Sequence, residues 1–179
     1  LAVALTYDEG HLVRGSTRGD GLRGEDVTLN LRTIRSIPLK LLGDHYPKHF
    51  EARGEVYLPK AAFHNLNQER IANGEPPYAN PRNTAAGSLR QLDPSIAASR
   101  PLDFFVYGIG YAEHATLPDN HWDVIQELGQ MGFKLNPETA RCQTLNDVEE
   151  YYNEWTVKKE TLGYDVDGVV VKLNAFKYQ

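Results

Sequence analysis

The sequence predicts an α+β domain in which mostly antiparallel sheet is flanked by helices. Residues 1–7 and 11–17 have the pattern of two strands joined by the turn Asp8-Glu9-Gly10, which indicates a hairpin. Further strands and helices interleave without the regular strand–helix–strand rhythm of a parallel sheet. The chain has 179 residues, of which 41% are hydrophobic and 24% charged. This length and composition indicate one globular domain over residues 1–179 with enough apolar side chains for a core.

Three later segments have strand composition. Residues 50–58 are a strand candidate that ends at Pro59, and residues 102–111 are rich in aromatic and β-branched side chains, which favour strands. Residues 166–173 form an apolar run interrupted only by Asp167, Gly168 and Lys172. Its length and branching predict a buried strand.

Four segments have helix signals. Pro59 suits the first turn of a helix that runs to about residue 73 and stops at Gly74. A short helix is expected over 83–92, closed by Asp93-Pro94. Two amphipathic helices follow, and each has a capping signal: a glycine after the first and a Thr-x-x-Asp box before the second. Their apolar faces consist of Val124, Ile125, Leu128 and Met131, and of Leu145, Val148, Tyr151, Tyr152 and Trp155.

Composition excludes several classes of protein. A single cysteine, Cys142, cannot form an internal disulfide or a thiolate zinc cage, which favours a reducing, cytoplasmic setting. We find neither a basic-then-apolar leader nor the roughly 20 consecutive apolar residues of a membrane helix. A net charge of -5 argues against nucleic-acid binding by bulk charge, so any such contact must be local. The six histidines lack metal-ligand spacing, and no metal ligand is predicted.

Lys172 and Glu55 are the first two candidate site residues. Lys172 lies near the end of the apolar run 166–173, where a lysine either extends to solvent or faces an anion. Glu55 follows Gly54 in a strand, and a glycine there permits close approach of a ligand or another backbone. A carboxylate suits ribose hydroxyls. Glu55 could equally form an ion pair with Arg53 on an exposed face.

Arg18 and Tyr107 are candidates for contact with a nucleotide. Arg18 opens a loop with three glycines, Gly19, Gly21 and Gly24, in which a guanidinium and backbone groups can meet a phosphate. A salt-bridged surface loop is the alternative, and adhesion through Arg18-Gly19-Asp20 is discounted. Tyr107 precedes a glycine in a strand, and its ring could stack on a base or belong to the core.

Residues 80–91 have a local charge opposite to that of the whole chain. Arg82 and Arg90 lie there among small residues and asparagines, a composition that can approach a phosphodiester backbone. We therefore place nucleic-acid contact here. An ordinary short amphipathic helix is the alternative.

Six motifs occur in the order and at the spacing of the bacterial NAD-dependent DNA ligases, which the whole chain resembles. They are Thr-Arg-Gly-Asp-Gly (17–21), Gly-Glu-Asp-Val-Thr (24–28), Arg-Gly-Glu-Val (53–56), Asn-Pro-Arg-Asn (80–83), Ala-Gly-Ser-Leu-Arg-Gln-Leu-Asp-Pro (86–94) and Asp-Gly-Val-Val-Val-Lys (167–172). ATP-dependent ligases and capping enzymes share the last motif but lack the Asn-Pro-Arg-Asn and Thr-Arg-Gly-Asp-Gly context.

The resemblance implies an adenylation (nucleotidyltransferase) domain of an enzyme that uses NAD and Mg²⁺ to seal nicks in double-stranded DNA during replication and repair. A lysine attacks the α-phosphate of NAD, AMP passes to a DNA 5′-phosphate, and a 3′-hydroxyl displaces it. By motif position, the residues that bind NAD or AMP would be Arg18, Glu55, Tyr107, Asp167 and Lys172. Arg82 and Arg90 would contact DNA or the activated phosphate. The resemblance also implies a cytoplasmic monomer without membrane association.

The sequence departs from the family pattern at two places. The nucleophile belongs to a Lys-x-Asp-Gly motif whose glycine would directly precede Leu1, so the catalytic lysine is expected outside this chain, as are the zinc finger and the other downstream domains. Lys159 stands where the resemblance predicts an arginine, and a lysine lacks the bidentate fork. We expect the isolated segment to be inactive. A non-catalytic nucleotide-binding or nucleic-acid-binding module is the competing hypothesis.

Overall fold

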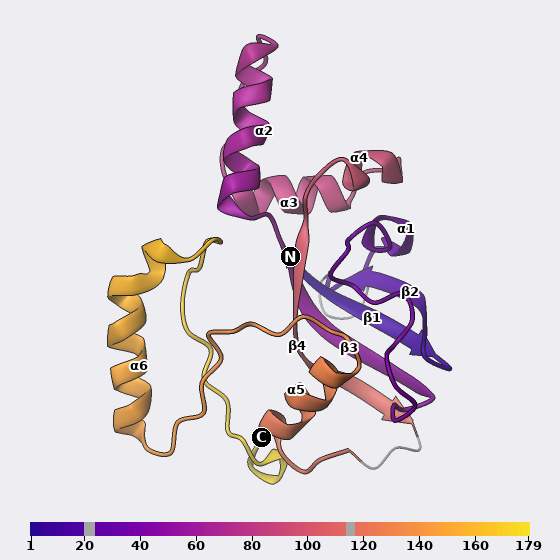
Figure 1. The fold of residues 1–179 in the computed structure, drawn as a ribbon, viewed down its shortest axis with the longest axis vertical. Helices are drawn as coiled ribbons and strands as arrows, with labels where there is room; N and C mark the ends of the chain where they lie inside the picture. Colours follow the sequence, from indigo (N-terminus) through magenta and orange to yellow (C-terminus); the bar gives the residue numbers. More distant parts are fainter. Residues whose placement is uncertain (20–23, 114–116) are drawn as a thin grey trace.

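The computed structural model describes residues 1–19, 24–113 and 117–179 (Figure 1). Within these ranges an antiparallel sheet of four strands has the order β2-β1-β3-β4. The strands are β1 (Ala2–Asp8), β2 (His11–Thr17), β3 (His49–Tyr57) and β4 (Asp103–Glu113). The predicted α+β class and the opening hairpin are confirmed, as are the strands expected at 50–58 and 102–111.

One face of the sheet carries the hydrophobic core. Along β1, the residues Val3, Leu5 and Tyr7 are buried, whereas the residues between them are only half-buried, as the two-residue period of a strand requires. Tyr7 stacks on Phe50 of the neighbouring strand, and its ring meets the edge of Phe133. This alternation leaves the second face of the sheet for side chains that are not part of the core.

Helices close the core face. α1 (Thr28–Leu31), α3 (Pro81–Leu89) and α5 (His121–Gln130) pack against β2, β3 and β4 respectively. Each contributes a fully buried leucine to the core: Leu31, Leu89 and Leu128. The apolar face predicted for α5 is therefore confirmed as a core face.

α2 (Lys60–Ala72) projects away from the sheet (Figure 1). It begins directly after Pro59 and is followed by Gly74, which has a φ of 74°. Both predicted boundary signals are confirmed. Leu66 is its buried residue, so most of α2 faces solvent.

The helix predicted over 83–92 overlaps the first of two short helices in this region. α3 begins earlier, at Pro81, because the Asn80 side chain accepts a hydrogen bond from the amide of Asn83 (2.7 Å). It ends at Leu89. Asp93 then caps a further helix, α4 (Pro94–Ala98), by accepting from the amide of Ser95. The Asp-Pro pair marks the start of this helix, which the sequence interpretation missed.

α6 (Leu145–Lys158) has the predicted capping box, in which Thr144 and Asp147 bond to each other's backbone amides. It stands apart from the sheet (Figure 1), and none of its residues is buried. The helix was correctly predicted, but its apolar stripe does not enter the core. Two 3₁₀ turns, η1 (Lys159–Thr161) and η2 (Phe176–Tyr178), follow. The described helices include none with the length and apolar character needed to cross a membrane.

The buried strand predicted over 166–173 is wrong. The segment has no strand assignment, and Val170 and Val171 are 81% and 62% exposed. Composition can favour an extended chain, but a buried strand also needs a neighbour to complete its hydrogen-bond ladder. At Val106, the outer side of β4 already pairs in parallel with Leu135. The described residues therefore offer this apolar run no sheet edge there.

Candidate functional site

The second face of the sheet is lined by polar and aromatic side chains above small residues. The half-buried or exposed positions of β3 alternate with its core positions and carry Glu51, Arg53, Glu55 and Tyr57. The β1 partners of Glu55 and Arg53 are alanines, Ala2 and Ala4. Small side chains on the neighbouring strand leave room above the sheet, which is the local condition for a surface site.

Tyr107 lies on β4, the edge strand next to β3, and contributes an aromatic ring to this face. Its residue is 38% exposed, and the ammonium of Lys172 lies 5.4 Å from the centroid of its ring. Burial raises the pKa of Tyr107, the negative charge of Glu55 raises it further, and the positive charges of Arg53 and Arg18 lower it. Glu55, Arg53 and Arg18 are therefore close enough for their charges to act on the Tyr107 hydroxyl.

Backbone contacts place Arg18 beside the same face. The amide of Arg18 donates to the carbonyl of Ala2 (3.1 Å), and Ala2 pairs with Glu55 across the sheet. Four predicted site residues, Arg18, Glu55, Tyr107 and Lys172, thus gather on one side of the sheet, although they are up to 154 positions apart in sequence, from 18 to 172.

Lys172 reaches Tyr107 from the extended segment 165–173. Hydrogen bonds fix the chain on both sides of this segment: the carbonyl of Gly163 accepts from the amide of Lys60, and that of Asn174 accepts from the amide of His121 (both 2.8 Å). Desolvation lowers the pKa of Lys172, because a cation over an aromatic ring has lost part of its hydration. The lysine therefore faces the sheet, although its own segment is exposed.

His121 belongs to the same neighbourhood and was missed by the sequence interpretation. Burial lowers the pKa of His121, and the charge of Lys172 lowers it further. A Cβ atom built on Gly108 would lie 3.7 Å from the His121 ring, which places the ring beside β4. No sequence spacing relates His121 to Lys172, so only the fold reveals this pair.

Glu55 does not pair with Arg53, which was the alternative to a binding role. Arg53 instead donates through Nε to the carboxylate of Glu51 (2.8 Å). The side chain of Glu55 is 47% exposed. A ligand can therefore reach this carboxylate.

Gly54 serves packing between strands. A Cβ built on it would lie 2.1 Å from the Phe104 ring and 2.4 Å from the carbonyl oxygen of Phe105. The close approach that a glycine permits is therefore made by the neighbouring strand β4. It is not evidence of a ligand at Gly54 itself.

Arg82 and Asp167, predicted to serve DNA and nucleotide contact respectively, form an ion pair with each other. Nη1 of Arg82 donates to Oδ2 of Asp167 at 3.0 Å, and both side chains are mostly exposed. The pair joins the start of α3 to the segment that carries Lys172. The basic segment 80–91 is thereby connected to the chain segment from which Lys172 reaches the sheet. The Asp167 carboxylate itself is bonded to Arg82.

Arg90 lies at the other end of α3, where its Nε donates to a carboxylate oxygen of Glu25 (2.8 Å). A groove of about 310 Å³ lies here, between the start of α1 and the end of α3. Leu92 on its rim is fully exposed.

Lys159, which stands where the resemblance predicts an arginine, begins η1 and is exposed.

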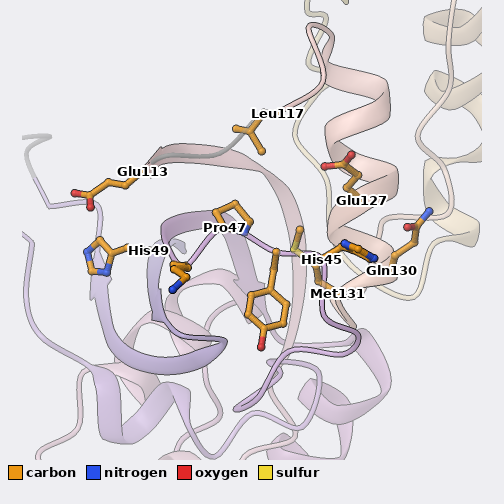
Figure 2. A pocket seen from close by; sticks show the side chains of 10 residues that line it. His45, Pro47, His49, Glu113, Leu117, Glu127, Gln130 and Met131 are labelled. Carbon is orange, nitrogen blue, oxygen red and sulfur yellow. The ribbon is translucent and has the colours of Figure 1, made fainter.

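A second hollow, of about 650 Å³, lies elsewhere, where β3 begins and β4 ends (Figure 2). Its lining includes His45, His49, Glu113, Glu127, Gln130 and Met131. None of the predicted site residues contributes to it. Across the described ranges we find no group of three or more His, Cys, Asp or Glu side chains arranged to hold a metal ion.

The fold and this arrangement define an α+β domain with cations, a carboxylate and an aromatic ring displayed on the open face of an antiparallel sheet. The family model described as the NAD-dependent DNA ligase adenylation domain matches residues 1–179. The chain belongs to this family.

Curated relatives named DNA ligase agree with the assignment. The chain is 53% identical to one from Dehalococcoides mccartyi, and 51% identical to those from Natranaerobius thermophilus and Cellvibrio japonicus. Each match covers the whole chain but 26% of the relative. The chain thus spans about a quarter of the length of these relatives.

Proposed function

We propose that this domain provides the adenylate pocket and part of the DNA contact surface of an NAD-dependent ligase that seals nicks in duplex DNA. The gathering of Tyr107, Lys172 and Glu55 on the open face of the sheet is the observation that carries the proposal. Family membership supports NAD as the nucleotide source. We further propose that the protein acts as a monomer in the cytoplasm.

Each side chain has chemistry that suits one part of the nucleotide. The Tyr107 ring offers a flat surface for adenine. The Glu55 carboxylate accepts hydrogen bonds from ribose hydroxyls. The positive charges of Arg18 and Lys172 neutralise part of the negative charge on the α-phosphate during transfer.

The proposed reaction begins when the Nζ atom of a lysine forms a bond to the α-phosphorus of NAD while the bond to nicotinamide mononucleotide breaks. AMP then passes to a DNA 5′-phosphate, and a 3′-hydroxyl displaces it to close the strand. Nearby cations and partial desolvation help to keep a lysine nucleophile deprotonated. Mg²⁺ would reduce phosphate charge, and this ion usually retains waters and binds through substrate phosphates with one or two carboxylates.

The 179 residues contain no Lys-x-Asp-Gly sequence. We therefore propose that the nucleophile comes from outside them, and that the isolated domain binds AMP without being adenylated. Arg82 and Arg90 are proposed to meet DNA phosphates. Their carboxylate partners, Asp167 and Glu25, are exposed, so a phosphate can replace them without uncovering a buried charge.

Binding and labelling together test the proposal. In titrations with AMP, the amide NMR signals of residues around Tyr107 are expected to shift. The signals of residues around the second hollow, at His45, are expected to stay unchanged. Incubation with adenylate-labelled NAD and Mg²⁺ is expected to leave the chain unlabelled. Shifts confined to the His45 hollow would refute the pocket, and a labelled chain would refute the missing nucleophile.

A further inference from the structure

Asn30 is buried and makes long-range contacts that the proposed nucleotide and DNA sites do not explain. It is 4% exposed, and its Nδ2 donates to the carbonyl oxygens of Leu89 (2.6 Å) and Gln91 (2.8 Å), which lie 59 and 61 positions away. The other buried polar side chains of the described ranges, those of Thr17, Thr84 and Ser88, bond within eight positions of themselves. Asn30 differs from them because it bonds to backbone groups that are distant in sequence.

The two carbonyls that Asn30 holds flank Arg90. α3 ends at Leu89 and Arg90 is its C-cap, where helix carbonyls lack partners within the helix. Asn30 supplies the missing donors from α1. The backbone on both sides of Arg90 is therefore held by α1 as well as by α3.

The guanidinium of Arg90 is held by the same short segment of chain. Glu25 accepts from its Nε (2.8 Å), and this bond does not use the edge formed by the two Nη groups. The segment is itself anchored to β2, because Thr28 accepts from the amide of Gly15 (2.9 Å) and Glu25 donates to Thr17 (3.0 Å). Backbone and side chain of Arg90 are thus both fixed from residues 25–30.

We infer that Asn30 is a positioning residue, which holds Arg90 in place before a DNA phosphate arrives. The inference rests on the proposed contact between Arg90 and DNA. A guanidinium that is already oriented loses less conformational freedom on binding, so each hydrogen bond to the phosphate yields more affinity. The adjacent groove at the start of α1 gives the phosphodiester backbone access to Arg90.

A double-mutant cycle on the chain tests this role, with fluorescence anisotropy of a labelled nicked duplex at low ionic strength. Arg90→Ala is expected to weaken binding about tenfold and to reduce the salt dependence by about one phosphate contact. Asn30→Ser is expected to produce most of both effects. Adding Asn30→Ser to Arg90→Ala is expected to weaken binding no further, although it still lowers the melting temperature.

A matched control separates positioning from general loss of stability. The part-buried Asn67 also joins its side chain to a distant backbone, at the amide and carbonyl of Tyr78 (2.7 and 3.1 Å). Asn67→Ser is expected to lower the melting temperature but to keep the affinity and its salt dependence. Full additivity of Asn30→Ser with Arg90→Ala, or unchanged affinity in Asn30→Ser alone, would overturn the inference. If Arg90→Ala itself leaves binding unchanged, the proposed DNA contact fails, and the inference fails with it.

A measurement on the unmodified chain applies even if Asn30→Ser does not fold. The Nε–H order parameter of Arg90 is expected to be near the rigid value of about 0.85 without DNA, whereas that of the mostly exposed Arg82 is expected below about 0.6. An Arg90 as mobile as Arg82 would overturn the positioning role.

Discussion

Lys172→Ala is the substitution that most directly tests the proposed nucleotide pocket. The ammonium lies over the Tyr107 ring, 5.4 Å from its centroid, and desolvation lowers its pKa. Two charges about 4 Å apart at an effective dielectric of about 20 attract by about 4 kcal/mol. Part of this is lost to desolvation, and hydrogen bonds to charged groups contribute about 1.5–3 kcal/mol net. We therefore expect AMP affinity to fall between about 10-fold and 150-fold.

The assay is titration with AMP of the chain and two variants, followed by NMR or calorimetry. Lys177→Ala is the matched control, because Lys177 also lies over a tyrosine ring, that of Tyr178 (4.8 Å), on the same C-terminal segment. It is expected to bind AMP as the unmodified chain does. Lys172 is exposed as a residue, so its replacement is expected to leave the melting temperature nearly unchanged. Equal AMP affinity in Lys172→Ala and Lys177→Ala would refute the placement of Lys172 in the pocket.

Three further substitutions test the structure around the site. His121 has a lowered pKa in the folded chain, so near and below about pH 6.5 the unfolded chain binds more protons, and stability falls on acidification. His121→Gln is therefore expected to reduce the loss of melting temperature between pH 7.5 and 5.5. An unchanged loss would contradict this. Gly54→Ala forces a methyl group against the Phe104 ring and is expected to cost about 1–3 kcal/mol in denaturant unfolding; a neutral effect would show that β4 can move. Thr144→Ala removes the cap of α6 and is expected to cost that helix about 1 kcal/mol, seen as faster amide exchange in its first turns, with exchange in β1 as the unaffected reference.

Local sequence signals predicted most elements correctly because the physical causes are local. Pro59 and Gly74 bound α2, and Thr144 with Asp147 caps α6, through contacts within a few residues. The boundary at Asp93 was misjudged because the same Asp-Pro pair can follow one helix and start another. The local signal is the same in both cases.

Burial was less predictable than secondary structure. Residues 166–173 and the stripe on α6 have apolar patterns typical of buried elements, yet neither contains a buried residue. A pattern shows which side chains gain free energy from burial, but not whether another element is there to cover them. The sequence also does not show which distant side chains meet. The sequence interpretation assigned Arg82 and Asp167 to different contacts, although the fold brings them together.

The sequence by itself determined the α+β class, the hairpin, most helix boundaries and a set of candidate residues in six motifs, because propensity, capping and motif spacing depend on neighbouring residues. Only the tertiary structure decided that Arg18, Glu55, Tyr107 and Lys172 share one face of the sheet, that His121 lies beside Lys172, and that Asn30 holds the backbone around Arg90. Strand pairing brings Glu55 and Tyr107 together, whereas the packing of helices and of the extended segment 165–173 places Asn30, His121 and Lys172. Contacts between elements distant in sequence leave no periodic signal along the chain.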